Sequence, residues 1–193
     1  MIELTHRGIR AMATVAGSGL LDGLREHDPV VAGPCPLGLD RPDSNVDVLC
    51  CAPPTTAFVE QVAAVVPDAQ AFTWHRDRVD AAYDAVIVTL HLDGLPVEVI
   101  AQARPTREQR AYRGLVVARR LLVLGGAPLQ TRVRDEHLRS DQIELEAAFA
   151  RALRMDGEPV TALLRLEAQT DAQLRELIRA ALGDSRHLES ADQ

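Results

Sequence analysis

Residues 31–50 read VAGPCPLGLDRPDSNVDVLC, a turn rich in glycine and proline that leads into an apolar strand. Alternate residues of a strand face the same side, so Asn45 and Asp47 are predicted to point together. Side chains with oxygen atoms, held side by side, are what a hard cation such as Mg²⁺ requires. The stretch therefore predicts a metal and phosphate site at the start of a strand.

A further acidic residue, Glu98, lies in the middle of the apolar run LPVEVIA at residues 95–101. A carboxylate among valine and isoleucine side chains is costly to bury unless it has a partner. We expect the strand of Glu98 to lie beside that of Asp47, so that both acids hold magnesium. The alternative is a salt bridge between Glu98 and one of the arginines.

The same turn contains residues suited to binding phosphates. A glycine turn at the end of a strand exposes backbone N–H groups, because no side chain blocks a close approach. We expect Gly33, Gly38 and Ser44 to hold phosphates. Nucleotidyl transfer needs this combination, since divalent cations bridge the triphosphate while a hydroxyl is placed in line with the α-phosphorus.

Composition limits the class of protein. A chain of 193 residues with 47% hydrophobic content fits one domain, or one domain with a helical appendage. A net charge of -7 argues against nucleic acid as a partner, because such binding depends on neutralising many phosphates, but allows a small phosphorylated ligand. All 21 basic residues are arginine, which codon usage in a GC-rich genome explains more simply than phosphate binding.

Several features indicate a cytoplasmic protein. The three cysteines, Cys35, Cys50 and Cys51, suit neither a disulfide framework nor a zinc knuckle. Arg7 and Arg10 precede an apolar segment that is short and broken by glycine, so we interpret it as a helix rather than a signal peptide. No apolar run approaches the ~20 residues that a bilayer span needs. We expect a soluble protein without a membrane partner.

The first half of the chain alternates helical and strand patterns. Helices are predicted at residues 5–26 and 56–66, and strands at 29–33, 46–51, 71–75, 83–92 and 95–101. Asp93-Gly94 between two apolar runs predicts a tight hairpin.

The second half is helical. After Pro105, helices are predicted at residues 107–124, 127–138, 143–154, 160–166 and 171–182, with Gly125-Gly126 and residues 155–157 as helix ends. We therefore expect an α/β domain at residues 1–103, a C-terminal helical subdomain at 104–183 and a frayed tail at 184–193.

Other chemistries find little support. The six histidines lack the spacing of zinc ligands, and Ser18 between two glycines is not a nucleophile elbow. Gly125-Gly126 lacks the strand-turn-helix setting of a dinucleotide loop.

The glycine turn and the residues after it carry a resemblance. Gly33, Gly38, Ser44, Asn45, Val46 and Asp47 resemble the glycine-turn and Ser-Asp-x-Asp signature of the nucleotidyltransferase-fold superfamily. More closely, the chain is similar, from Pro29 to about Leu164, to a bacterial family called domain of unknown function 4269. Further matches follow in order, at residues 97–102, Pro105, Gln109, 111–113, 121–122, 125–126, Glu146 and 148–150.

The resemblance implies an α/β (α+β) fold, with a nucleotidyltransferase-like mixed β-sheet and flanking helices followed by a C-terminal helical bundle. It places Asp47 and Glu98 in the second and third acidic positions of a Mg²⁺ site, which in this superfamily can hold two metals. Two residues depart from the pattern. Pro34 stands where the superfamily has Ser or Thr and removes an N–H donor, and Asn45 stands where it has the first Asp and removes a negative charge. Asp43 would compensate if the strand reached it.

Three functions stay open at this stage. The first is a magnesium-dependent nucleotidyltransferase that moves a nucleoside monophosphate from a nucleoside triphosphate to an unknown acceptor hydroxyl. In it, Tyr112 and Arg113 either contact the nucleotide or dock their helix on the sheet. The second is a catalytically degenerate binding or regulatory protein of an antitoxin-like kind. In the third, the helical half mediates homodimerisation and the site is vestigial.

Overall fold

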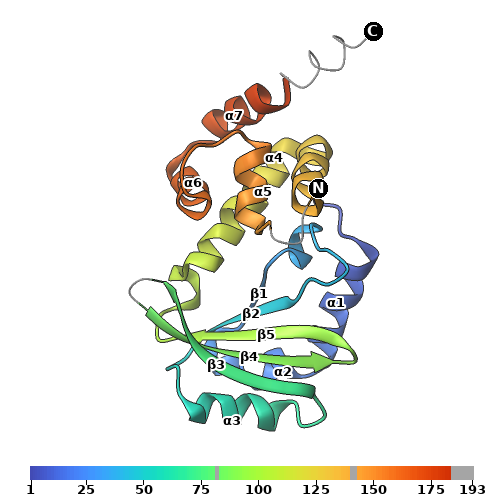
Figure 1. The fold of residues 1–193 in the computed structure, drawn as a ribbon, viewed down its shortest axis with the longest axis vertical. Coiled ribbons are helices and arrows are strands. Elements are labelled where there is room, and N and C mark those ends of the chain that lie inside the picture. Colours follow the sequence, from blue (N-terminus) through green and yellow to red (C-terminus); the bar gives the residue numbers. More distant parts are fainter. Residues whose placement is uncertain (81–82, 140–142, 184–193) are drawn as a thin grey trace. The chain divides into compact units, whose positions relative to one another are not determined.

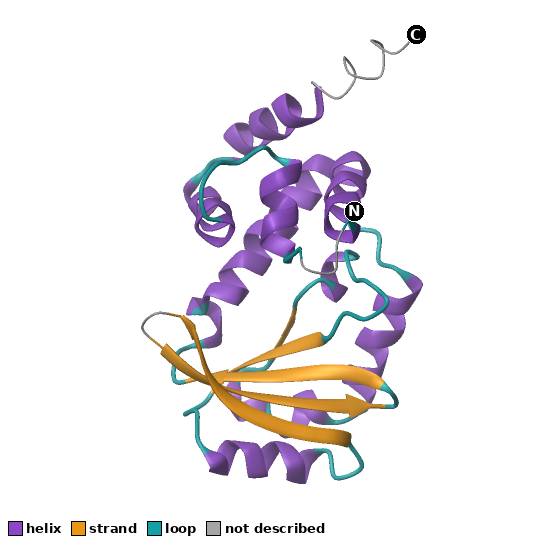
Figure 2. Cartoon of the chain, viewed as in Figure 1, coloured by secondary structure: helices purple, strands orange, loops and turns teal. Residues whose placement is uncertain are grey.

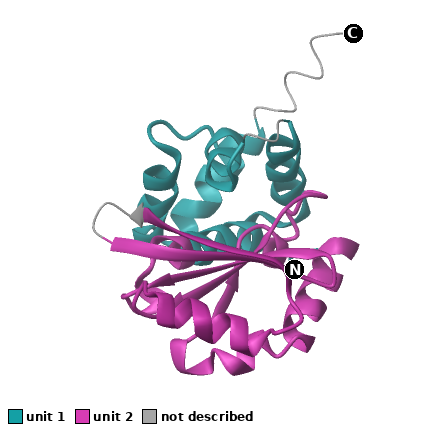
Figure 3. Ribbon diagram, turned by 60° about the horizontal axis from the view of Figure 1, so that its bottom comes forward, with its two compact units in different colours: residues 1–3, 114–193 teal, residues 4–113 magenta. Residues whose placement is uncertain are grey.

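The computed structural model describes residues 1–80, 83–139 and 143–183. The chain divides into two compact units, Leu4–Arg113 and Met1–Glu3 with Gly114–Gln193 (Figure 3). The tail predicted at residues 184–193 lies outside the described residues.

The first unit contains a five-stranded sheet with helices against it (Figures 1 and 2). Its helices are α1 (His6–Gly17), α2 (Leu20–Gly23) and α3 (Thr56–Val65), and its strands are β1 (Val30–Ala32), β2 (Val46–Cys51), β3 (Gln70–Asp80), β4 (Tyr83–Leu92) and β5 (Leu95–Gln102).

The sheet is mixed, as predicted. Its strand order is β1-β2-β5-β4-β3, in which β2 and β5 are parallel and the other neighbours are antiparallel. The parallel pair needs a long crossover, and α3, β3 and β4 supply it. The crossover brings β2 beside β5, although about 50 residues of chain separate their centres.

Alternation along the strands sorts the side chains of β2 and β5 onto two faces. Alternate valines, with Cys50 and Ala101, join the apolar core together with residues of α1, α2 and α3. Because the side-chain period of a strand is two, the intervening Asp47 and Glu98 face away from that core. The helices that stabilise the sheet thus leave the acidic face uncovered by their own side chains.

The hairpin predicted at Asp93-Gly94 is confirmed. Leu92 pairs with Leu95 across it, and Asp93 and Gly94 have φ values of 50° and 77°. Positive φ at both central residues defines a type I′ turn, whose twist matches that of the flanking strands.

Two predicted elements differ from the structure. The helix predicted over residues 5–26 is wrong as a single element, because Gly19 adopts φ 78° and separates α1 from the four-residue α2. The strand predicted at residues 71–75 extends over Gln70–Asp80. This edge strand is exposed from Thr73 to Arg78, so polar residues continue it without the apolar alternation on which the prediction depended.

The second unit is helical, as predicted. It takes most of α4 (Arg110–Leu138), together with α5 (Leu145–Ala152), α6 (Pro159–Arg165) and α7 (Asp171–Gly183). The helix end predicted at Gly125-Gly126 is a break inside α4, where Gly126 has φ 62° and ψ -158°. The N-terminus joins this unit, since Gln130 donates to the Glu3 carbonyl over 2.7 Å and accepts from its N–H over 3.1 Å.

In the part of the chain that the structure describes, no helix combines the length and the apolar character needed to cross a bilayer.

The hairpin turn allows a test of the backbone argument. A Cβ at Gly94 would meet no atom within 4 Å, so Gly94→Ala adds only the strain of a left-handed residue, about 1–2 kcal/mol. We expect urea unfolding to show that loss of stability. Gly17→Ala is the matched control, because it also adds a methyl group in open space but lies at the end of a helix. Equal stabilities of the two variants would contradict the turn assignment.

Candidate active site

Two carboxylates face each other on neighbouring strands. Asp47 of β2 and Glu98 of β5 are register partners in the parallel pair. Neighbouring strands of a sheet lie about 4.8 Å apart, so side chains at such positions on one face lie side by side. Both residues are partly buried. The structure therefore brings together the two acids that the sequence predicted as metal ligands.

Asn45 joins this pair through its side chain. Its Nδ2 donates a hydrogen bond to Glu98 Oε1 over 2.9 Å. Strand β2 begins only at Val46, so Asn45 reaches Glu98 from the end of the preceding loop. The bond offsets part of the repulsion between two acids held on one face. Together with the register pairing of Asp47 and Glu98, the bond groups residues 45, 47 and 98 into one cluster.

Gly33 lies directly against Asp47. A Cβ at this position would come within 2.6 Å of Asp47 Oδ2, and Gly33 has φ 75°. The space and the left-handed backbone both require glycine here. The turn predicted to hold phosphates thus lies beside one of the predicted metal ligands.

The rest of the loop is a compact structure built on Pro34. The Pro34 carbonyl accepts from the N–H groups of Leu37 and Leu39, each over 3.1 Å, and starts a short 3₁₀ turn at Cys35–Leu37. The Gly38 N–H donates to the Cys35 carbonyl over 3.2 Å, and Gly38 has φ 64°. The presence of proline at position 34 has a structural explanation, because its fixed φ suits the start of a helical turn.

Ser44 closes the loop. Its Oγ accepts from the Arg41 N–H over 2.9 Å, and its own N–H donates to the Arg41 carbonyl over 3.2 Å. Asp43 lies in the turn between them, exposed and 3.6 Å from Arg41 Nε. Because β2 begins at Val46, Asp43 does not share the strand parity that would add it to the acids.

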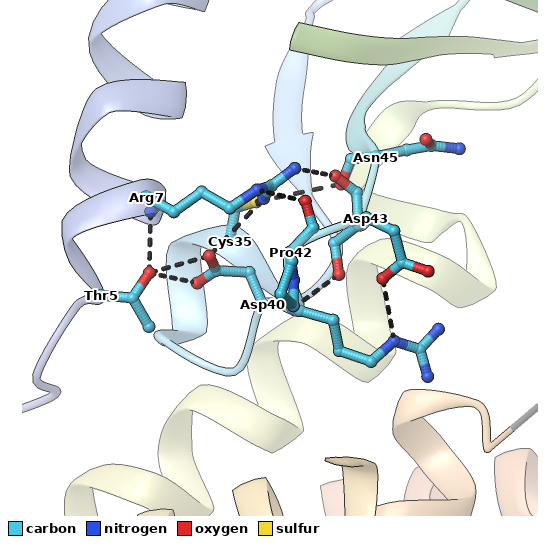
Figure 4. Close-up of polar contacts among 10 residues, drawn as sticks. Thr5, Arg7, Cys35, Asp40, Pro42, Asp43 and Asn45 are labelled. Carbon is cyan, nitrogen blue, oxygen red and sulfur yellow. Dashed lines mark hydrogen bonds and ion pairs between the residues drawn. The ribbon is translucent and has the colours of Figure 1, made fainter. Parts of the chain in front are cut away.

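Arg7 of α1 holds this loop in place through several polar contacts (Figure 4). The sequence analysis did not identify this residue. Its guanidinium donates to the carbonyls of Pro42, over 3.1 Å, and Ser44, and to Cys35 Sγ over 3.5 Å. Nη1 also lies 3.5 Å from Asp40 Oδ2. One side chain therefore contacts four residues of the loop that ends at Asn45, namely Cys35, Asp40, Pro42 and Ser44.

Asp40 is the acid that this arrangement satisfies. Its side chain is 1% exposed, and the Thr5 hydroxyl lies 2.8 Å from each carboxylate oxygen. Thr5 Oγ1 also accepts from the Gly8 N–H over 2.8 Å and so caps α1. A Cβ at Gly8 would lie 3.0 Å from Asp40 Oδ1, so the glycine lets helix and loop approach closely. The available sequence signal was Asp40, which follows two glycine turns in a mostly apolar loop. An aspartate that becomes buried there requires a cation nearby.

Two of the cysteines of this unit, Cys35 and Cys50, are buried in its interior. Burial, with a contribution from Asp40, raises the pKa of Cys35 to about 11, and burial raises the pKa of Cys50 to about 12. Both thiols therefore stay neutral near pH 7 and are poor nucleophiles.

Tyr112 and Arg113, the other predicted nucleotide contacts, lie near the start of α4. The Tyr112 ring lies 6.0 Å from the Arg107 guanidinium, and the Arg113 N–H donates to the Gln109 carbonyl. Gln109 is buried and donates to the carbonyls of Cys50 and Arg104 over 2.9 and 3.1 Å. The start of α4 is thus tied to the end of β2, within the first unit.

The donor set fits a hard cation. Asp47 and Glu98 offer carboxylate oxygens, and Asn45 offers an amide oxygen if its amide turns over. Within residues 1–80, 83–139 and 143–183, no three His, Cys, Asp or Glu side chains converge on one point. The cluster thus offers two carboxylates and one amide as candidate ligands.

The five-stranded mixed sheet with flanking helices is a nucleotidyltransferase-like fold, and solved structures with TM-scores of 0.50 and 0.56 share it. The GLD-2/RNP-8 complex is similar with a TM-score of 0.56 and 8% identity, over 92% of this chain and 78% of that chain. A cytoplasmic RNA terminal U-transferase has a TM-score of 0.50 and 13% identity, over 81% of this chain and 42% of that chain. The Cid1 poly(U) polymerase with MgGTP has a TM-score of 0.48 and 12% identity, over 69% and 42%. This chain thus spans less than half the length of the last two.

The chain belongs to the family described as domain of unknown function (DUF4269), whose model matches residues 13–166. Among curated proteins, none is similar in sequence.

The contact between Gly33 and Asp47 predicts the effect of a single methyl group. In Gly33→Ala, the backbone strain of the positive φ alone should cost about 1–2 kcal/mol of stability. The new Cβ would also come within 2.6 Å of Asp47 Oδ2, so the total loss should be larger than that. Thermal and urea unfolding measure the loss.

Gly19→Ala is the control for Gly33→Ala, because Gly19 has φ 78° and no atom near its Cβ position. If the two variants lost equal stability, Asp47 would not lie against the turn.

Removing the guanidinium of Arg7 should release the loop. Arg7→Gln leaves the buried Asp40 carboxylate without its cation, and hydrogen bonds to charged groups contribute about 1.5–3 kcal/mol each. We expect a loss of about 2 kcal/mol or more in urea unfolding, with faster amide hydrogen exchange in residues 35–45.

Arg10→Gln removes an exposed arginine from the same helix and should change neither measurement. Equal effects of the two substitutions would contradict the fastening role of Arg7.

Proposed function

We propose that this protein is a magnesium-dependent nucleotidyltransferase that moves a nucleoside monophosphate from a nucleoside triphosphate to an acceptor hydroxyl. The observation that carries the proposal is the cluster of Asp47 and Glu98 on facing register positions, with the Asn45 amide bonded to Glu98. Two like charges side by side reduce stability unless a cation or donors offset them. The cluster therefore suits a site that binds a cation.

In this proposal each residue has a definite task. Asp47 and Glu98 hold Mg²⁺, and Asn45 turns its amide to add the Oδ1 atom. Bound magnesium would neutralise charge on the triphosphate and on the departing pyrophosphate. The side chains of Asp47 and Glu98 point away from the apolar core that β2 and β5 form with the helices.

Phosphate binding belongs to the glycine loop. Gly33 presents bare backbone beside Asp47, as a close approach of phosphate requires. The Ser44 hydroxyl accepts from Arg41, and with respect to the described residues its own hydrogen remains available to donate. Gly38 acts through the shape of the loop, because its N–H is bonded to the Cys35 carbonyl. Tyr112 and Arg113 are assigned to the nucleotide.

The second candidate is a protein of the same fold that binds a partner without catalysis. Asn45 favours it, because an amide in place of a carboxylate lowers the negative charge that attracts magnesium. The two candidates differ in one measurable property, the dependence of nucleotide binding on the metal.

Calorimetric titration with each nucleoside triphosphate, with and without Mg²⁺, separates them. The enzyme predicts binding that requires Mg²⁺ and is lost in Asp47→Asn, with release of pyrophosphate when an acceptor is present. Asp43→Asn is the matched control, since Asp43 is an exposed acid in the loop just before β2 and pairs with Arg41. Nucleotide binding that is equally strong with and without Mg²⁺, or the absence of nucleotide binding, would favour the second candidate.

Asn45→Asp tests the assignment of the metal cluster. A third carboxylate beside Glu98 should lower the melting temperature without Mg²⁺ and raise the affinity for Mg²⁺ by about tenfold or more, so that added metal restores stability. Unchanged magnesium affinity in Asn45→Asp would show that residue 45 does not reach the cation.

A further inference from the structure

A groove in the helical unit lies between α4 and α7, far along the sequence from the acidic cluster. It has a volume of about 620 Å³ and is lined mainly by Leu124, Pro128, Arg175, Ile178, Arg179 and Leu182. Pockets of about 300–1,000 Å³ are the usual size for small ligands. We call these residues the α4–α7 groove.

The shape of the groove comes from the break in α4. Gly126 leaves the helical conformation at φ 62° and ψ -158°, and Pro128 follows it. A Cβ at Gly125 would lie 2.6 Å from the Leu129 side chain, so only glycine allows the chain to fold this closely. The hollow is therefore built into the backbone by three neighbouring residues rather than left by chance between side chains.

The groove has an apolar floor and a rim of one charge. Ile178 is 4% exposed, and Leu124 and Leu182 are partly buried. Arg175 and Arg179 are exposed, and in the described part of the chain neither forms an ion pair or hydrogen bond. Residues four apart on a helix are neighbours, with Cβ atoms about 5–6 Å apart, so the two guanidinium groups can share one anionic head.

A neighbouring cavity differs from the α4–α7 groove in the charges of its lining residues. It has a volume of about 310 Å³ and shares Pro128 and Leu182 with the α4–α7 groove. Its rim holds both signs, and Arg139 is paired with Glu136 over 3.5 Å. The α4–α7 groove differs from this cavity in that its apolar floor is bordered by two arginines that form no ion pair with the described residues.

We propose that the α4–α7 groove binds a small amphipathic anion, with an apolar body on Leu124, Ile178 and Leu182 and a carboxylate or phosphate head between Arg175 and Arg179. Two arginines and no aromatic residue suit one head group rather than a nucleic acid strand, which needs many cations or stacking partners. The site is independent of the proposed nucleotide chemistry.

Calorimetric titration of the full chain with decanoate, decyl phosphate and decanol tests this proposal. We expect saturable binding of one molecule of either anion per chain, and binding of decanol at least tenfold weaker. Hexanoate should also bind at least tenfold more weakly than decanoate, because each buried CH₂ adds to affinity. Preference for decanoate would indicate a free fatty acid, and preference for decyl phosphate a phospholipid head.

Charge variants locate the binding. Arg175→Gln combined with Arg179→Gln should weaken decanoate binding at least tenfold. Arg119→Gln combined with Arg151→Gln is the matched control, since it removes two exposed arginines of the same unit and should change nothing. Circular dichroism and melting temperature confirm that each variant folds.

Three outcomes would overturn the proposal. They are the absence of saturable binding, equal weakening by both double variants, and equal affinity for decanoate and decanol. Light scattering adds another check. If the wild type were a dimer and Arg175→Gln/Arg179→Gln a monomer, a second copy of the chain would cover the groove and the ligand assignment would be wrong.

Discussion

The facing carboxylates of Asp47 and Glu98 are the constraint on which the rest of the first unit depends. Their strands are adjacent and parallel, so the register itself holds two negative groups side by side. Like charges at such positions oppose folding, and the protein offsets them locally through the Asn45 amide at 2.9 Å. The core supplies the stability that this arrangement costs, because the other faces of both strands are packed with buried apolar side chains against three helices.

The loop before β2 separates two kinds of acid. Asp40 is buried and fully engaged by Thr5 and Arg7, so it acts as part of the scaffold. Asp47 and Glu98 are only partly buried and face away from the core, so they are the acids with access to a ligand. Gly33 links the two sets, since its left-handed backbone turns the chain from β1 into the loop and leaves room for the Asp47 carboxylate. Rigid support beneath a partly exposed cluster is what precise placement of a cation requires.

Local pattern was enough to predict most of this fold, and the reason is the strength of the strand signals. Alternation in residues 46–51 and 95–101 determined which side of the sheet each acid faces, and Asp93-Gly94 determined the hairpin. Contacts between distant segments could not be predicted in the same way. Arg7 meets the loop 28–37 residues later, and nothing in the periodicity of α1 distinguishes it from the exposed Arg10. The length of the exposed β3 was missed because pairing with β4 determines it, and the break at Gly19 was missed because apolar spacing does not reveal the left-handed backbone of one glycine.

In the proposed magnesium site, Asn45 would set how strongly the cluster attracts a cation. An aspartate there would add a third negative charge, whereas the amide adds a donor and lowers the repulsion that Glu98 experiences. A cation at the cluster would have to displace the hydrogen bond between Asn45 and Glu98. It would also be attracted by one negative charge fewer than if residue 45 were an aspartate. The amide can turn over without moving the backbone, so the oxygen ligands for a hard cation are all retained. If the cluster binds magnesium as proposed, two carboxylates and one amide would hold it less tightly than three carboxylates, and the protein would respond to magnesium bound together with a triphosphate more readily than to the free ion.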